Sequence, residues 1–222
     1  MRLYLRNVNK HYEGYKDNQA LIDVSFKIEP HEKIVTVIGR SGSGKSTLLN
    51  LIAALDSPDS GEIYVGEQNL AKLNRDQLAN YRLHNIGIVF QFFNLFPTLT
   101  LFENIAVPGY LSKIPDKILE RKVEGIAEQI GIGHLLKKYP HEVSGGEAQR
   151  TAICRALINT PKLLLADEPT GNLDTETSKV IVQLLKNLVD EQKLTLIIVT
   201  HDTNLIQNID KTIELRNGRV II

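Results

Sequence analysis

The stretch Gly39–Thr47 holds the residues with the clearest chemical meaning in this sequence. It reads GRSGSGKST and fits G-x-x-x-x-G-K-[ST], a pattern typical of loops that bind phosphate. Glycines let the backbone adopt positive φ and approach a ligand closely, so that successive N–H groups can point at one anion. Lys45 adds a positive charge, and the Ser46 hydroxyl can ligate Mg²⁺. The pattern predicts a nucleotide-phosphate site, although an ordinary glycine-rich turn could share the same letters.

The residues on either side supply the elements that such a loop needs. The apolar run 34–38 before the loop is typical of a buried strand, and residues 48–55 after it favour a helix. A helix that starts beside the loop directs its N-terminal N–H groups at the same anion. We therefore expect nucleotide contacts from Gly39, Ser41, Gly42, Ser43, Gly44, Lys45, Ser46 and Thr47.

Two carboxylates follow another apolar run. Residues 163–166 read LLLA, which is typical of a central parallel strand, and Asp167 and Glu168 come directly after them. Beside a phosphate loop, one carboxylate can approach Mg²⁺ while the next orients or deprotonates a water. The alternative is that both are simply solvated at the end of a strand.

Gln91 and His201 each follow a further predicted strand, over residues 86–90 and 196–200. Ligands of open α/β sheets bind outside the carboxyl ends of the strands, where these side chains would lie. Gln91 is thus placed to ligate a metal or hold a water, and His201 to face the same crevice. Either residue could equally begin a loop or have a structural role.

The N-terminal and C-terminal parts favour antiparallel strands. Residues 24–28 alternate between apolar and polar side chains, and we expect residues 1–38 to begin the chain as antiparallel β-structure. A predicted polar loop, residues 10–18, contains Tyr12 and Tyr15, and a ring there could stack on a purine or cover the edge of the core. Further elements are expected as a strand at 62–65, helices at 75–82 and 176–192, and a hairpin around Asn217-Gly218.

Residues 92–160 have helical patterns in place of strand patterns. Helices are predicted at about 101–110, 116–130 and 145–159, which indicates an all-helical insert in an α/β domain. The insert begins with the aromatic stretch 92–97, FFNLFP, which could form a partner surface or pack against the main sheet.

Ser144-Gly145-Gly146-Glu147 opens the last helix of this insert. Ser144 and Glu147 have the S-x-x-E spacing of a capping box, and two glycines at a helix start also leave N–H groups open to an anion. The residues alone leave both interpretations open. Cys154, on the same helix, is expected to be a small buried hydrophobic residue.

Composition limits the class of protein. The 222 residues contain 26 Lys+Arg and 26 Asp+Glu, so the net charge is zero, which argues against a broad nucleic-acid-binding surface. The one cysteine excludes an intrachain disulfide and fits a reducing compartment. No apolar run has the length of a signal-peptide core or of a membrane span. We expect a soluble chain whose membrane role, if it has one, comes through a partner.

In this order, the motifs resemble those of the ATP-binding subunits of ABC transporters across the whole chain. The phosphate loop resembles Walker A, residues 164–168 resemble Walker B with its catalytic glutamate, and residues 144–150 resemble the signature sequence. The signature departs from the commonest LSGGQQ form at Val143, Glu147 and Ala148 but keeps the serine and both glycines. Gln91 resembles the Q-loop, Asn172-Leu173-Asp174 the D-loop, His201 the switch histidine, and Tyr12, with Tyr15 as a rival, the adenine-stacking aromatic residue.

The resemblance implies an α/β fold. It consists of a P-loop NTPase core with a mostly parallel sheet, an N-terminal antiparallel β subdomain and an inserted all-helical subdomain. Residues 1–222 would form a single ABC ATPase domain, with 1–91 and 161–222 in the RecA-like core and 92–160 in the helical subdomain.

The resemblance also implies an ATPase that dimerises with a second copy around two MgATP. One copy would hold ATP and Mg²⁺, and the signature of the other copy would close over the γ-phosphate. The implied catalytic residues are Glu168, His201, Lys45 and Gln91, and the implied Mg²⁺ ligands are Ser46, Gln91 and Asp167. Beyond the loop, the implied nucleotide contacts are Tyr12, Ser144, Gly145, Gly146 and Asp174.

The implied partner is an integral membrane transporter subunit, through which this cytoplasmic chain would lie on the cytoplasmic face of the inner or plasma membrane. No nucleic acid is expected. Gly171-Asn172-Leu173-Asp174 and the residues around Gln91 look like the lipoprotein-releasing and macrolide-export branch. The alternative is a soluble ABC ATPase in an assembly process such as iron–sulfur cluster biogenesis. A nucleotide-gated scaffold is a third possibility, against which the intact Glu168 and His201 argue.

Overall fold

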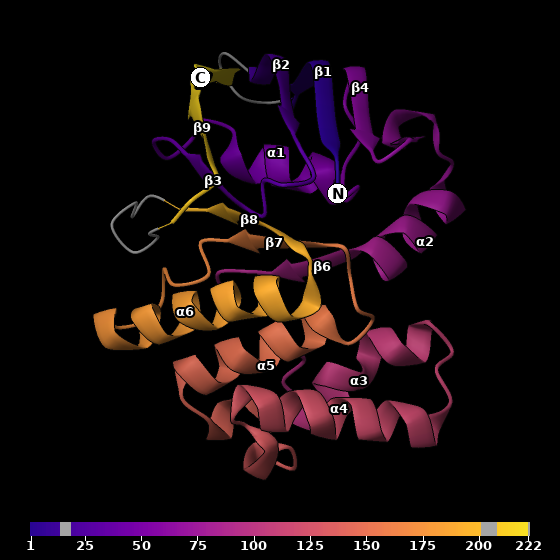
Figure 1. Ribbon diagram of the computed structural model, residues 1–222, viewed down its shortest axis with the longest axis vertical. Coiled ribbons are helices and arrows are strands. Elements are labelled where there is room, and N and C mark those ends of the chain that lie inside the picture. Colours follow the sequence, from indigo (N-terminus) through magenta and orange to yellow (C-terminus); the bar gives the residue numbers. More distant parts are fainter. Residues whose placement is uncertain (14–18, 201–207, 222) are drawn as a thin grey trace.

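The computed structural model describes residues 1–13, 19–200 and 208–221. Two β-sheets and helix α1 (Lys45–Ile52) form one end of the molecule, and a group of helices forms the other (Figure 1). Within the described residues, no helix is both long and apolar enough to cross a membrane.

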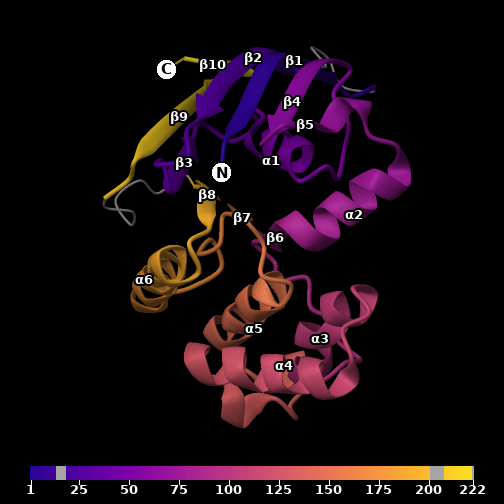
Figure 2. The ribbon, with the colours of Figure 1, turned by 45° about the vertical axis from the view of Figure 1, so that its right-hand side comes forward.

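An antiparallel sheet contains the N-terminal strands, in the order β2-β1-β4-β5. Its members are β1 (Leu3–His11), β2 (Gln19–Ile28), β4 (Ser60–Val65) and β5 (Gln68–Asn69). Apolar side chains alternate along β1, so that Leu3, Leu5 and Val8 face the core and are at most 1% exposed. This sheet curves over α1, as Figure 2 shows, and confirms the predicted antiparallel β subdomain.

The second sheet is mostly parallel, with the strand order β10-β9-β3-β8-β7-β6. Among the described strands of this sheet, β10 alone pairs antiparallel, with β9. Its strands are β3 (Ile34–Ile38), β6 (Ile86–Val89), β7 (Leu163–Asp167), β8 (Thr195–Val199), β9 (Lys211–Arg216) and β10 (Arg219–Val220). The predicted strands at 34–38, 86–90, 163–166 and 196–200 are therefore four neighbours in one sheet.

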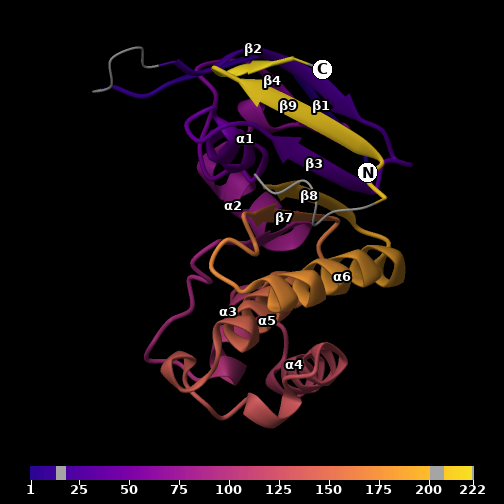
Figure 3. The same cartoon turned by 90° about the vertical axis from the view of Figure 1, so that its left-hand side faces the viewer.

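The parallel sheet separates two hydrophobic cores. Successive residues of β7 point to opposite faces: Leu163 and Leu165 pack with α1 and the antiparallel sheet, whereas Leu164 and Ala166 pack with the helices beyond. All four are fully buried, as expected for a strand that is covered on both faces. Figure 3 shows α5 (Gly145–Leu157) and α6 (Thr175–Gln192) beneath β7 and β8.

The predicted helical insert is confirmed. It contains α3 (Leu101–Leu111), α4 (Asp116–Ile130) and α5, with short 3₁₀ turns at Gly133–Leu135 and Pro140–Glu142. Helix α2 (Arg75–Asn85) and a 3₁₀ turn, Leu70–Lys72, precede β6. Cys154 is fully buried, as predicted, and burial raises the pKa of its thiol.

Several predicted limits were wrong. Residues 34–38, expected within the antiparallel start of the chain, form β3, which pairs in parallel with β8 and β9. Helix α2 continues to Asn85, beyond the predicted end at 82. The predicted loop at 10–18 begins later, because β1 continues to His11, which pairs with Gln19 of β2. Helix α1 begins at Lys45, three residues before the predicted start, because Gly44 in the left-handed region ends the loop there. Pairing across strands and backbone conformation at a glycine decide these limits, and neither is visible in the hydrophobic pattern.

Candidate functional site

The glycine-rich loop joins β3 to α1 at the carboxyl edge of the parallel sheet. Gly44 precedes the helix with φ 102°, a conformation that favours glycine. A Cβ atom at Gly44 would lie 2.4 Å from the carbonyl oxygen of Ala20 on β2. The glycine is therefore required both by its backbone conformation and by close packing against the antiparallel sheet.

Lys45 is the first residue of α1, and only 7% of it is exposed. Its Nζ donates hydrogen bonds to the carbonyl oxygens of Gly39 at 2.8 Å and Arg40 at 3.1 Å. The loop thus curls around a buried ammonium group, whose hydrogen bonds within the described residues go to carbonyl oxygens. An anionic ligand at this place would gain a full charge pair.

A cavity of about 410 Å³ lies against the loop and collects side chains from four separate parts of the chain. Its lining residues are Ala20, Ser41, Gly42, Gly44, Lys45, Ser46, Thr47, Gln91, Asp167 and Glu168. Three predicted strand-end residues are thereby brought together with the loop, because β3, β7 and β6 lie in the same sheet.

Asp167 and Ser46 form the part of the cavity that could bind a cation. Burial raises the pKa of Asp167, and the adjacent Glu168 raises it further, while the hydrogen bond from Ser46 and the charge of Lys45 oppose the shift. A hydroxyl, a carboxylate and the amide oxygen of Gln91 line one cavity, and Mg²⁺ prefers oxygen ligands. This donor set fits the predicted magnesium site.

Glu168 follows β7 in a left-handed conformation, with φ 44°. Its N–H donates a hydrogen bond to the carbonyl oxygen of Val199 at 2.9 Å, which ties it to the end of β8. A non-glycine residue with positive φ is uncommon and often marks a functional site. The fold thus holds the backbone of Glu168 at the edge of the cavity.

Gln91 has two neighbours in the fold that the sequence pattern did not identify. The Asn172 side chain donates from Nδ2 to the carbonyl oxygen of Gln91 at 2.9 Å. A Cβ atom at Gly171 would lie 2.8 Å from Nε2 of Gln91, so a larger residue there would push the end of the Gln91 side chain aside. Asn172 and Gly171 are 80 residues or more from Gln91 in sequence, and only the fold brings them together.

Two predicted loop contacts face elsewhere. Gly39 and Ser43 do not line the phosphate cavity but a separate hollow of about 500 Å³, together with Glu214, Leu215 and Asn217. Ser41 and Gly42 line both spaces. The loop therefore lies between two hollows, with its first half along the second hollow and its second half along the phosphate cavity.

Tyr12 lies beside the loop but does not line the cavity. It is 38% exposed, and its hydroxyl donates a hydrogen bond to Oδ2 of Asp56 at 2.8 Å. Burial and this hydrogen bond raise the pKa of Tyr12, while the side chain of Thr47 opposes the shift, which places the hydroxyl next to α1. Tyr15 and His201 lie outside the described residues.

The signature residues lie away from the cavity of their own chain. Ser144 caps α5, and its Oγ and N–H both donate to Oε2 of Glu147 at 2.8 Å. The capping box is therefore confirmed. Ser144 and Gly145 are exposed, and Gly146 packs against Thr177 of α6. Asp174 also lies outside the cavity, where its side chain caps α6.

An apolar groove of about 650 Å³ lies beside the aromatic stretch, between the sheet and the helical insert. Its walls include Leu83, Ile88, Phe90, Phe96 and Leu111. Phe96 and Leu111 are 50% and 65% exposed, and Phe92 nearby is 72% exposed. Of the two alternatives for the stretch, Phe92 and Phe96 favour the partner surface, because an apolar surface of this kind is typical of a partner site, whereas Leu95 packs against the core.

Arg155 of α5 fixes the entrance to this groove, a role that the sequence did not reveal. Its guanidinium donates to the carbonyl oxygen of Phe93 at 2.7 Å and to that of Asn94. Both residues have positive φ, at 59° and 49°. Arg155 thereby connects α5 to the segment that follows Gln91.

The fold and the site define a nucleotide-binding cassette, and the comparisons give its family. The family described as "ABC transporter" matches residues 21–171, so the chain belongs to the ABC transporter family. It is the ATP-binding subunit of an ABC transporter, and it is an ATPase.

Relatives extend the match over almost the whole chain. The ABC transporter ATP-binding protein YxdL of Bacillus subtilis is 44% identical, over 98% of this chain and 84% of that protein. The lipoprotein-releasing system ATP-binding protein LolD of Shewanella oneidensis is 37% identical, over 97% of this chain and 94% of that protein. A dimeric structure of the cassette MJ0796, bound to ADP and Pi after hydrolysis, has 37% identity and a TM-score of 0.90, over 99% of this chain and 97% of that chain.

Proposed function

We propose that this subunit hydrolyses MgATP between two copies of itself and so drives a separate membrane subunit, in the lipoprotein-releasing and export branch of the family. The observation that carries the proposal is the cavity that gathers Lys45, Ser46, Gln91, Asp167 and Glu168. Phosphoryl transfer at such sites depends mainly on positioning and on charge stabilisation, and this cavity offers groups for both.

The roles follow from position and chemistry. The loop N–H groups and Lys45 hold the β- and γ-phosphates, and Lys45 exchanges its carbonyl partners for phosphate oxygens. Ser46, Gln91 and Asp167 hold Mg²⁺, which supplies positive charge against the phosphates when bound. Glu168 polarises the attacking water, and we assign His201 to contact the γ-phosphate and Glu168.

A second copy completes the site in this proposal. Ser144, Gly145 and Gly146 lie outside the cavity of their own chain, yet they begin a capped helix whose N-terminus attracts anions. Placed over the γ-phosphate of the other copy, they would close the site, with Asp174 nearby. The dimeric structures of the cassette MJ0796 support this arrangement.

The membrane subunit docks in the apolar groove beside Phe92 and Phe96. The groove is open, apolar and tied through Arg155 to the signature helix, so that closure of the dimer can move it. Docking would hold this chain at the cytoplasmic face of the membrane. Similarity to LolD supports the branch.

Two variants test the proposal. Lys45→Ala should weaken ATP binding about tenfold to a hundredfold, because it removes a charge-assisted hydrogen bond. Unchanged ATP affinity would refute the assigned role of the loop.

Tagged Glu168→Gln protein with ATP should recover a membrane protein with few spans and a large extracytoplasmic domain from detergent-solubilised membranes of its own cell. Recovery of soluble proteins only would favour the assembly-process alternative.

A further inference from the structure

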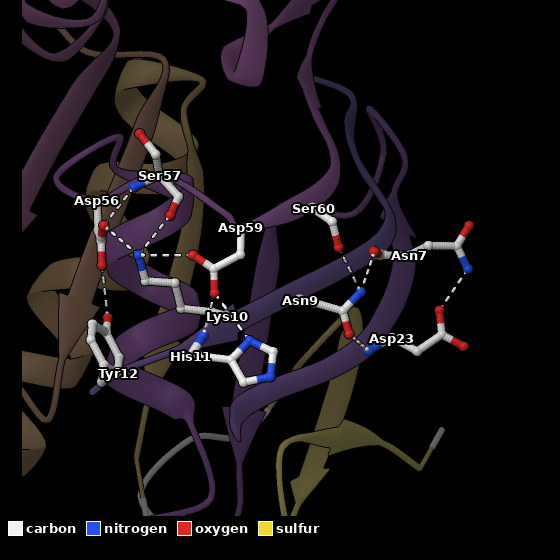
Figure 4. Close-up of polar contacts among 10 residues, drawn as sticks. All are labelled: Asn7, Asn9, Lys10, His11, Tyr12, Asp23, Asp56, Ser57, Asp59 and Ser60. Carbon is white, nitrogen blue, oxygen red and sulfur yellow. Dashed lines mark hydrogen bonds and ion pairs between the residues drawn. The ribbon is translucent and has the colours of Figure 1, made fainter. Parts of the chain in front are cut away.

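A polar network joins the end of β1 to the connection between α1 and β4, beside the phosphate-binding loop (Figure 4). The Nζ atom of Lys10 donates to Oδ1 of Asp56 and to the carbonyl oxygen of Ser57, both at 2.8 Å. The hydroxyl of Tyr12 donates to the other carboxylate oxygen of Asp56, also at 2.8 Å. Asp56 therefore holds the lysine with one oxygen and the tyrosine with the other.

Lys10 occupies a position where the strand pattern places an apolar residue. It follows Val8 on the inward face of β1, and its side chain is only 11% exposed. Burial opposes the charged ammonium, but the hydrogen bond to Asp56 and the nearby carboxylates outweigh burial and raise the pKa of Lys10. A buried charge is costly unless it is paired, so removal of Asp56 would leave this lysine poorly satisfied.

The same lysine also contacts the ring of Tyr12. Its Nζ lies 5.1 Å from the centre of the ring, which is within the range of a cation–π interaction. The ring is thus held at its hydroxyl by Asp56 and at one face by Lys10, while 38% of the residue remains exposed. The tyrosine is fixed before any ligand binds, and it keeps free surface beside α1.

We propose that Asp56 and Lys10 are positioning residues for nucleotide binding, which hold the ring of Tyr12 ready to stack on the base. The inference rests on the proposed function, to which it adds Tyr12 as the residue that stacks on the base. Fixing a side chain in its bound conformation lowers the ordering cost of association. Asp56 therefore adds affinity for the base without touching the ligand.

If Asp56 had only a structural role, the binding measurements would differ. The network also ties β1 to the chain that follows α1, and its loss could disturb the neighbouring phosphate loop. In that case the binding of any phosphate ligand would weaken. If Asp56 acts through the tyrosine ring, only ligands that carry a base would bind less well.

The experiment compares MgATP with magnesium tripolyphosphate, which has no base, by isothermal titration calorimetry on the full chain. For Tyr12→Phe and Asp56→Ala, the Kd for MgATP should rise about threefold to tenfold, in line with the cost of ordering one side chain. The Kd for tripolyphosphate should stay within about twofold of the unchanged protein. Asp56→Asn, which keeps the shape of the side chain, serves as the second variant if Asp56→Ala fails to fold.

The double variant shows whether the two residues act as one unit. Tyr12→Phe with Asp56→Ala should bind MgATP no more weakly than Asp56→Ala alone, because both changes break the same contact. Asp23→Asn is the matched control, since Asp23 accepts from the Asn7 side chain in the neighbouring polar cluster and is bonded to neither Lys10 nor Tyr12 among the described contacts. Its Kd for MgATP should not change.

Three results would overturn the inference: unchanged MgATP affinity in both single variants, equal weakening for both ligands, or additive effects in the double variant. Failure of the proposed function looks different. There, Lys45→Ala would leave the binding of MgATP and of tripolyphosphate intact, whatever Asp56 does.

Discussion

At the scale of single residues, the phosphate cavity holds charged groups in surroundings that suit a ligand better than the free protein. Lys45 is buried, and in the part of the chain that the structure describes its hydrogen-bond partners are carbonyl oxygens. Asp167 is partly buried next to Glu168, and its raised pKa means that the folded protein disfavours its negative charge. Such sites are typical of proteins that give up stability for function.

We predict that Asp167→Asn stabilises the nucleotide-free protein at neutral pH. The pKa of Asp167 is higher in the folded state than in the unfolded state, so the folded state binds the proton more tightly. Stability from this group is therefore greatest at low pH and is lost as the pH rises through the folded pKa. Thermal unfolding at pH 7 should show a higher Tm for the variant.

The Tm difference between Asp167→Asn and the unchanged protein should shrink as the pH is lowered. At a pH below the ordinary range of aspartate, both proteins carry a neutral group at this position and the Tm difference should fall. In the variant, adding Mg²⁺ to bound ATP should no longer raise the Tm, because one oxygen ligand of the metal has lost its charge. A lower Tm for Asp167→Asn at pH 7 would contradict the assignment.

At the scale of elements, two helices of the insert begin in the same way but have different expected roles. Thr100 caps α3 with Glu103, and Ser144 caps α5 with Glu147. In each, the hydroxyl donates to the glutamate and accepts from its N–H, at 2.7 and 3.2 Å in α3 and at 2.8 and 3.3 Å in α5. The pair forms a natural control for the proposed second role of Ser144.

We predict that Ser144→Ala and Thr100→Ala lower the free energy of unfolding by similar amounts, about 0.5–2 kcal/mol each, as is usual for lost caps. Only Ser144→Ala should reduce ATP turnover strongly, because only α5 is proposed to close over a γ-phosphate. Chemical denaturation and steady-state ATPase assays measure the two effects. Equal turnover in the two variants would leave Ser144 as a cap alone.

At the scale of the whole molecule, the phosphate cavity and the signature residues, which we propose to be two halves of one site, lie apart in the same chain. The phosphate cavity lies at the edge of the parallel sheet, and Ser144 and Gly145 are exposed on the helical insert. Two hydrophobic cores, one on each face of the sheet, keep the two parts in a defined relation. A dimer with twofold symmetry would complete two sites at once.

We predict that Glu168→Gln keeps ATP binding, lowers turnover about a hundredfold or more, and accumulates as a dimer with ATP. If Glu168 polarises the attacking water as proposed, its loss slows hydrolysis, so the closed state persists. Light scattering after gel filtration, with and without ATP, measures the mass of the particle. A monomer under both conditions, or normal turnover, would refute the role of Glu168.

Much of this arrangement was determined by the sequence itself, because it depends on neighbours along the chain. The apolar runs gave β3 and β7, capping residues set the start of α5, and the glycine-lysine spacing marked the phosphate loop. These signals are local, since periodicity and capping act within a few residues. The order of motifs then indicated the family, which the comparisons confirm.

Only the tertiary structure decided which residues line the same cavity or contact one another across the fold. Ala20 lines the cavity, and the side chain of Asn172 donates to the carbonyl oxygen of Gln91, because distant segments pack together there. Gly39 and Ser43 line a different hollow. Lys10, which the sequence placed in a polar loop, became a buried partner of Asp56 because β1 extends to pair with β2. Such contacts depend on sheet order and packing, and no pattern of neighbouring residues encodes them.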